Sequence, residues 1–332
     1  MKKYAGIDIG FGNVKGVTQD TDGRRTATTF QSCVEPVSAS PLAGFQGNPN
    51  ALVSEVYPVV QGVRYRVATE QVVAPKIGRP QPVDDFQQSA AHTALIAAAM
   101  HSLDAPLVDV LALGTPVHTF AHHRGELERR FTGKHDHGLG PVSVRQVLVL
   151  PQPFGSLLLA QHSGQISPDP TVANVVIDPG YFSTDSLVAT GLDIDIKRSH
   201  GVPVGAHAVY AQIAEILQQE FGARISRLDR IEHALRSGKP LTVLDRTVDL
   251  QRYLLQVQPL IQDTVNSLKA RLGSHEDARI IVTGGGAALF FKAIKSAFPR
   301  NQVIQMVDPL RGNAEGFLIA ARAASQRYWR AQ

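Results

Sequence analysis

Short apolar runs that end at an acidic residue and a glycine recur along the chain. One such run, residues 4–9, is followed by Gly10, and another, residues 175–177, is followed by Asp178 and Gly180. Buried strands give continuous apolar runs of this length, and glycine commonly marks their ends. Polar side chains follow each glycine, and a second strand-like segment follows them. The pattern therefore predicts a strand–turn–strand hairpin in each half of the sequence.

The rest of the apolar pattern has both strand-like and helical periods. Apolar positions alternate in 63–67, as in a half-buried strand, and share one helical face in 205–221. Further strands are predicted at residues 108–114, 142–149, 193–199, 279–282 and 302–307. Further helices are predicted at residues 90–100, 121–131, 156–161, 228–237, 250–272 and 314–330. Residues 35–60, rich in proline and glycine, are predicted to form a surface loop. Strands followed by helices in both halves indicate an α/β protein.

The length of the chain favours two domains. A chain of 332 residues exceeds the size at which one hydrophobic core usually suffices. We place the first domain at residues 1–168 and the second at residues 169–313. The final helix, within residues 314–332, is expected to pack back on the first domain.

Composition and charge narrow the class of protein. Hydrophobic residues make up 43% of the chain and charged residues 19%, which is typical of a folded globular protein. The net charge of +4 comes without a dense block of lysine and arginine, so direct sequence-specific DNA binding is not expected. Cys33 is alone, which excludes a disulfide framework and fits a reducing compartment. No apolar run approaches the roughly 20 residues that cross a bilayer. We therefore expect a soluble, cytoplasmic protein without membrane contact.

Five histidines lie close together in the sequence, between residues 118 and 137. His118 and His122 are four residues apart and could share a helix face. Without cysteine or a set of acidic residues beside them, a metal site is not expected. The five are predicted to form a solvated basic surface.

The first glycine turn has the residue types that hold phosphate. Gly10 and Gly12 let backbone N–H groups approach phosphate oxygens without a Cβ in the way. Asn13 can add a side-chain hydrogen bond, and Lys15 can reach a terminal phosphate as a point charge. The segment is therefore a candidate phosphate-binding loop.

Two later turns repeat this design. After Gly180, the hydroxyls of Ser183 and Thr184 and the carboxylate of Asp185 could hold phosphate or brace the hairpin. The triple glycine 284–286 follows an apolar strand and precedes a helix, which suits a nucleoside or an α-phosphate resting on backbone. The candidate ligands of this turn are Gly284, Gly285 and Gly286. No P-loop and no dinucleotide-binding fingerprint occurs in the chain.

Two carboxylates are the candidate metal ligands. Asp8 and Asp178 each end a predicted strand next to a glycine turn. Mg²⁺ prefers few protein carboxylates and keeps several waters. We predict that both aspartates hold Mg²⁺ through water.

The order and separation of these segments resemble the actin-like ATPase superfamily. The matching segments are Asp8-x-Gly10-x-x-Asn13-x-Lys15, Asp178-x-Gly180-x-x-Ser183-x-Asp185, Thr283-Gly284-Gly285-Gly286-Ala287 and Asn313-Ala314-Glu315-Gly316. Within the superfamily the chain looks most like the plasmid-segregation actins of the ParM/StbA type. The resemblance spans residue 4 to about residue 320. The second turn departs from the family pattern, because Pro179, Tyr181 and Phe182 replace its usual residues.

The resemblance implies a fold and an activity. The fold would be α/β, with two similar ribonuclease-H-like domains around a nucleotide cleft. The activity would be hydrolysis of ATP, or of GTP, with Mg²⁺, coupled to assembly and turnover of a filament. Gln152 matches the position that acts on the attacking water; a glutamine orients water rather than serving as a strong base. The catalytic residues implied are thus Gln152, Asp8 and Asp178.

The partners follow from the same resemblance. The protein would self-associate into cytomotive filaments that segregate plasmid DNA. A DNA-bound adaptor protein at a centromere-like site would carry the DNA specificity.

Other functions are compatible with the same fold. A small-molecule kinase would need a substrate pocket and a carboxylate near the terminal phosphate. A chaperone-like ATPase would need a substrate-binding domain beyond residue 332, and a cell-shape actin would need an amphipathic membrane segment. A non-enzymatic binding module would not be expected to keep Asp8, Lys15, Asp178 and the triple glycine.

Overall fold

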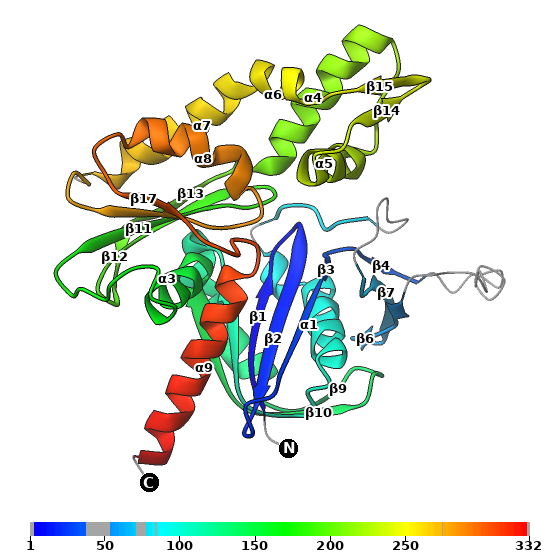
Figure 1. The fold of residues 1–332 in the computed structure, drawn as a ribbon. Coiled ribbons are helices and arrows are strands. Elements are labelled where there is room, and N and C mark those ends of the chain that lie inside the picture. Colours follow the sequence, from blue (N-terminus) through cyan, green and yellow to red (C-terminus); the bar gives the residue numbers. More distant parts are fainter. Residues whose placement is uncertain (1–2, 38–53, 71–77, 84, 274, 331–332) are drawn as a thin grey trace. The chain divides into compact units, whose positions relative to one another are not determined.

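A computed structural model describes residues 3–37, 54–70, 78–83, 85–273 and 275–330 (Figure 1). The chain divides into two compact units. Unit 1 comprises Met1–Pro168 and Leu310–Gln332, and unit 2 comprises Asp169–Pro309. Each unit contains a mixed β-sheet with helices, so the predicted α/β class is confirmed.

The main sheet of unit 1 has the strand order β3-β2-β1-β8-β10-β9. Its central strands β1, β8 and β10 are parallel, while β2, β3 and β9 pair antiparallel to their neighbours. The strand bounds are β1 (Lys3–Ile9), β2 (Asn13–Asp20), β3 (Arg25–Gln31), β8 (Leu107–Thr115), β9 (Gly133–Asp136) and β10 (Pro141–Pro151). The strands β1 and β8 are buried along most of their length, as their continuous apolar sequences predict.

Helices cover both faces of this sheet (Figure 1). On β8, Leu111 and Leu113 pack in one cluster with α1 (Ala90–Ser102), while Val110 and Ala112 pack against α9 (Gly312–Arg330). Successive side chains of a strand point to opposite faces, so the two helices lie on opposite sides. Ser89 caps α1: its hydroxyl accepts a hydrogen bond from the N–H of His92 at 3.1 Å.

The C-terminal helix α9 also packs closely against α3 (Gln152–His162). A Cβ on Gly316 would lie 1.7 Å from the carbonyl oxygen of Gly155, so only glycine permits this approach. Further along α9, the Ser325 hydroxyl donates to Asp109 Oδ2 at 2.5 Å. Arg145 donates to the same carboxylate, at 2.6 Å from Nε and 3.1 Å from Nη2. These contacts attach α9 to unit 1.

The prediction of a solvated histidine surface is wrong for His123. This residue lies on α2 (Phe120–Phe131), which follows the short 3₁₀ helix η3 (Val117–Thr119). Its side chain is 1% exposed, and Nδ1 lies 3.5 Å from the amide nitrogen of Gln88 on the 3₁₀ helix η2 (Phe86–Gln88). The helix turns His123 inward while His122 stays exposed, because adjacent helix positions face about 100° apart.

Unit 1 contains a second, four-stranded sheet, and three of its strands fall at or within the segment predicted to be a surface loop. Its strands are β4 (Val34–Pro36), β5 (Glu55–Val56), β6 (Val59–Val60) and β7 (Val63–Ala68). Each of the first three pairs antiparallel with β7. The prediction of a surface loop over residues 35–60 is therefore wrong for β4, β5 and β6, whereas the strand predicted at residues 63–67 is confirmed as β7. Residues 38–53, within the predicted loop, lie outside the described residues.

The sheet of unit 2 has the order β13-β12-β11-β16-β17. Its bounds are β11 (Ala173–Pro179), β12 (Thr184–Thr190), β13 (Asp193–Val202), β16 (Arg279–Val282) and β17 (Val303–Gln305). The three strands β11–β13 pair antiparallel in sequence order, and β16 and β17 continue the sheet in parallel. Unit 1 builds β1, β2, β3, β8 and β10 in the same way, so the two sheets share one topology.

The helices of unit 2 are α4 (Ala206–Phe221), α5 (Leu228–Ser237), α6 (Gln251–Gln256), α7 (Gln258–Leu272) and α8 (Ala287–Ala297). The predicted single helix over 250–272 is divided at Val257, because Pro259 has no N–H to continue the helical hydrogen bonds and suits the first turn of a new helix. A small hairpin, β14 (Leu241–Val243) with β15 (Arg246–Val248), was not predicted. No helix in the described part of either unit is long and apolar enough to cross a membrane.

Candidate nucleotide-binding site

The β1–β2 hairpin of unit 1 brings two predicted site residues into contact. Asp8 and Lys15 are directly opposite in the antiparallel register, and Lys15 Nζ lies 2.8 Å from Asp8 Oδ2. Both side chains are buried, with residue exposures of 1% for Asp8 and 9% for Lys15. A buried charge is tolerated when it is paired with an opposite charge, as these two are. The pair places a cation directly behind the turn at residues 10–12, hereafter the first turn.

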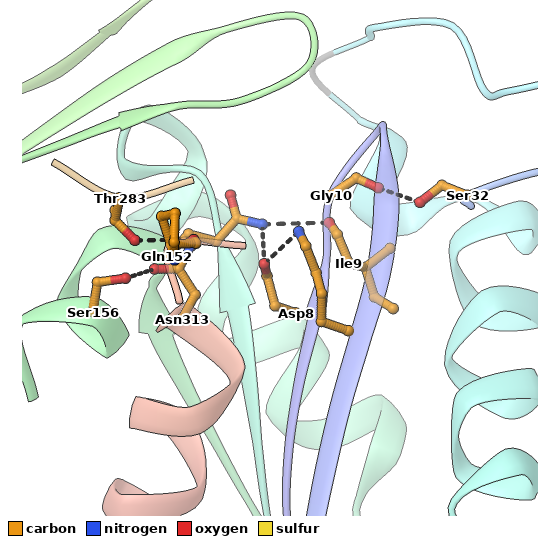
Figure 2. Close-up of polar contacts among 10 residues, drawn as sticks. Asp8, Ile9, Gly10, Ser32, Gln152, Ser156, Thr283 and Asn313 are labelled. Carbon is orange, nitrogen blue, oxygen red and sulfur yellow. Dashed lines mark hydrogen bonds and ion pairs between the residues drawn. The ribbon is translucent and has the colours of Figure 1, made fainter. Parts of the chain in front are cut away.

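Gln152 completes this group from a different part of the sequence. It is the first residue of α3, immediately after β10, and its amide nitrogen donates to Asp8 Oδ1 at 2.7 Å and to the Ile9 carbonyl at 3.3 Å (Figure 2). Both partners are acceptors, so the amide nitrogen must face them. The amide oxygen is then directed away from Asp8, as an acceptor. This orientation suits a side chain that holds a water molecule by its O–H group.

The expected short helix over 156–161 begins earlier than predicted. Pro151 occupies the N-cap position of α3, and Pro153 follows in its first turn, where proline favours helix initiation. Gln152 is thereby fixed to a helix rather than carried by a loop. Ser156, one turn further on, donates to the Asn313 side chain at 2.7 Å, which joins α3 to the start of α9.

The β11–β12 hairpin of unit 2 repeats the geometry of the first. Asp178 and Asp185 are opposite in register, as Asp8 and Lys15 are. The N–H of Gly180 donates to the Ser183 carbonyl at 2.8 Å, and the N–H of Gly10 donates to the Asn13 carbonyl at 3.1 Å. The two turns are thus closed by equivalent hydrogen bonds. The prediction of matching hairpins is confirmed.

The two hydroxyls after Gly180 have different surroundings. Ser183 Oγ lies 3.1 Å from Asp185 Oδ2, beside the turn. Thr184 is fully buried, and its hydroxyl donates to the Val204 carbonyl at 2.7 Å. Ser183 therefore contacts another predicted site residue, whereas the Thr184 hydroxyl is bonded to backbone within unit 2.

The turn at residues 180–182, hereafter the second turn, rests on the start of α4. The N–H of Ala206 donates to the Gly180 carbonyl at 3.0 Å, and the N–H of His207 donates to the Tyr181 carbonyl at 2.8 Å. The Tyr181 and Phe182 rings pack against the His207 ring, with centroids 5.4 and 4.8 Å apart. The residues that depart from the family pattern therefore attach the turn to a helix, and sequence reasoning missed this support.

The triple glycine contacts Asp178. Gly284 has φ of +84°, and a Cβ there would lie 1.9 Å from Asp178 Oδ1. Gly286 donates to the Pro179 carbonyl at 2.8 Å, so the glycine turn packs on the end of β11. Arg236 Nη2 donates to the Gly285 carbonyl at 3.1 Å. The candidate phosphate and nucleoside segments of unit 2 are thus adjacent.

The carboxylates fit the predicted magnesium chemistry. Asp8 and Asp178 are ionisable oxygen ligands of the kind that Mg²⁺ prefers, one in each unit. Both oxygens of Asp8 already accept hydrogen bonds, which favours contact with a hydrated ion over direct ligation. Within the described ranges, no group of three or more His, Cys, Asp and Glu side chains could hold a metal ion by itself.

Comparison with known proteins assigns the family. The model of the actin-like protein N-terminal domain matches residues 6–155, and the model of the C-terminal domain of archaeal MreB-like actin homologues matches residues 176–296. Together they span most of both units. The chain belongs to the actin-like proteins. Comparison with curated protein sequences found no match.

Solved structures show the same fold over nearly the whole chain. An archaeal actin homologue superimposes with a TM-score of 0.77 at 20% identity, covering 98% of this chain and 100% of that one. Its complex with ADP gives 0.73 at 20% identity, covering 96% and 99%. A subunit of a 15-stranded ParM filament from Clostridium botulinum gives 0.72 at 18% identity, covering 97% and 99%. The chain therefore has an actin-like fold.

Proposed function

We propose that this protein binds and hydrolyses ATP and polymerises in response to it. The observation that carries the proposal is the contact of Gln152 with Asp8, 2.7 Å long, beside the Asp8–Lys15 ion pair. The contact brings together the Lys15 ammonium group for phosphate, the Asp8 carboxylate for a hydrated metal ion and the Gln152 amide for water. The ADP complex of the archaeal actin homologue supports nucleotide binding on this fold.

Each residue then has a defined role. Lys15 exchanges part of its interaction with Asp8 for a phosphate oxygen. The Gln152 amide oxygen accepts a hydrogen bond from the attacking water and aligns it with the terminal phosphorus. Backbone N–H groups of the first and second turns, with Ser183, hold the phosphate oxygens, and the triple glycine holds the nucleoside.

Magnesium would be held through water by Asp8 and Asp178, and it would supply positive charge that neutralises the phosphate oxygens. Because glutamine is not a strong base, hydrolysis is expected to be slow and to follow polymer formation. GTP is an alternative nucleotide for the same groups.

For the cellular role, we propose a cytomotive filament that segregates plasmid DNA. Support comes from ParM neighbours, among them a filament structure and a non-polymerisable mutant. A DNA-bound adaptor protein would connect the filament to its cargo. The alternative is a monomeric small-molecule kinase or chaperone-like ATPase on this fold.

Nucleotide binding and hydrolysis test the site in both units. Lys15→Ala, in unit 1, and Gly284→Ala, in unit 2, should each weaken ATP binding by more than tenfold in a fluorescent-nucleotide titration. Gln152→Ala should keep ATP affinity within about threefold and slow single-turnover hydrolysis by 10²-fold or more, because it acts on the water. Unchanged hydrolysis by Gln152→Ala would refute its assignment. Phosphate release from wild-type protein that never pellets would favour the monomeric alternative.

A further inference from the structure

Ser32 contacts the first turn although no sequence motif indicates it. It follows β3 and precedes β4, at the junction between the main sheet and the four-stranded sheet of unit 1. The residue is fully buried. Its hydroxyl donates to the Gly10 carbonyl, and its N–H donates to the Gly12 carbonyl at 3.1 Å. One residue therefore holds two carbonyl groups of a three-residue turn.

Peptide geometry converts this contact into an effect on ligand-binding groups. In a trans peptide plane, the carbonyl of one residue and the N–H of the next point in opposite directions. With the carbonyls of Gly10 and Gly12 held toward Ser32, the N–H groups of Phe11 and Asn13 are directed away from it. Convergent N–H groups in a turn form an anion-binding concavity. Ser32 thus fixes the direction in which the first turn presents its donors.

In unit 2, different groups hold the carbonyls of the second turn. There the N–H groups of Ala206 and His207, at the start of α4, hold the carbonyls of Gly180 and Tyr181. By the same geometry, the N–H groups of Tyr181 and Phe182 are directed away from α4. Two carbonyls of each turn accept hydrogen bonds, from Ser32 in the first turn and from the N-terminus of α4 in the second. Both units therefore fix the orientation of their turn through hydrogen bonds to two of its carbonyl groups.

We propose that Ser32 is a positioning residue for phosphate binding by the first turn. The proposal rests on the proposed nucleotide-binding function and adds to it a residue outside the motifs. Ser32 acts by orienting donors that contact phosphate equally before and during hydrolysis. Its loss should therefore raise the KM for ATP and leave kcat nearly unchanged.

The test compares three substitutions in the full chain. Ser32→Ala removes the hydroxyl bond to Gly10 and keeps the backbone bond to Gly12. Ser32→Thr keeps the hydroxyl. Ser325→Ala is the matched control, because Ser325 is also a buried serine of unit 1, 1% exposed, and its hydroxyl donates to Asp109 rather than to the turn. ATP and ADP affinities, steady-state kinetics and thermal melting are measured for each.

We expect Ser32→Ala to weaken ATP and ADP binding about three- to tenfold, the equivalent of one hydrogen bond. Ser32→Thr should restore at least half of that loss, and Ser325→Ala should lower the melting temperature without changing affinity. If Ser32→Ala and Ser325→Ala have equal nucleotide affinities, the positioning role is refuted. If Ser32→Thr does not fold, the comparison of Ser32→Ala with Ser325→Ala still decides whether Ser32 has the positioning role. A wild-type protein that binds neither nucleotide would refute the proposed function itself, which is a distinct outcome.

Discussion

A buried histidine should make the stability of this protein depend on pH in a defined way. His92 lies on α1 in unit 1, with 2% of its surface exposed. Burial, followed by the charge of Arg130 and by His123, lowers the pKa of His92 to about 3. The unfolded chain has the ordinary histidine pKa of 6.5. The unfolded state therefore binds a proton between these values, and the folded state does not.

The sign and size of the effect follow from proton linkage. The folded pKa lies below the unfolded pKa, so this contribution to stability is fully present above pH 6.5. It is lost as the pH falls from 6.5 toward 3. Each tenfold rise in proton concentration in that range costs about 1.4 kcal/mol. At pH 5, protonation of His92 in the unfolded chain should lower the free energy of unfolding by about 2 kcal/mol.

His92→Leu isolates this contribution. The imidazole Nδ1 of His92 has no hydrogen-bond partner among the described residues, so the substitution removes no buried hydrogen bond at that atom. Urea unfolding at pH 7 and pH 5 gives the change in unfolding free energy for each protein. The variant should lose about 2 kcal/mol less than wild type between the two pH values. His122→Leu, at an exposed position of α2, is the control and should behave as wild type. Equal losses in wild type and His92→Leu would show that His92 does not cause this pH dependence.

Three substitutions test other parts of the structure. Gln152→Glu replaces the amide donor 2.7 Å from Asp8 Oδ1 with a second carboxylate. The unfolding free energy at pH 7, measured by urea titration, should fall by about 2 kcal/mol, and an unchanged value would contradict the contact. Gly284→Ala places a Cβ 1.9 Å from Asp178 Oδ1. The unfolding free energy, measured by the same method, should fall by at least about 2 kcal/mol, whereas a fall below roughly 0.5 kcal/mol, the effect of a neutral surface change, would exclude strain there. Ala97→Val adds two methyl groups to an apolar cavity of about 40 Å³ under α1. The unfolding free energy should rise by up to about 1 kcal/mol, and a lower melting temperature would show that the cavity cannot hold the added methyl groups.

The three glycine turns could be predicted because their signal is local. An apolar run, an acid and a glycine identify a strand end, and the order of three such turns identified the family. The Asp8–Lys15 contact also follows once a hairpin of that length is assumed, since cross-strand partners are fixed by register. The division of the predicted 250–272 helix also has a local signal, since Pro259 lies in the first turn of α7.

Other features depend on contacts distant in sequence. Nothing around Ser32 indicates that it holds the first turn, because its partners are backbone carbonyls some 20 residues away. The strand β4 forms because β7 supplies its hydrogen bonds, and its own three residues carry no strand signal. The β14–β15 hairpin has Leu244 at a φ of +54°, where glycine or asparagine is usual, so its turn has no recognisable sequence. The partners of His123 likewise come from other elements.

ATP-driven polymerisation is tested most directly by following polymer mass and phosphate release in the same sample. Light scattering and a phosphate assay are recorded together after Mg²⁺ and ATP are added, with ADP, no nucleotide and the Lys15→Ala variant in parallel. If ATP drives polymerisation, scattering should rise only with ATP and wild-type protein, and phosphate release should lag behind it. Phosphate release without scattering, or scattering that is equal with ATP, with ADP and without nucleotide, would contradict ATP-driven polymerisation.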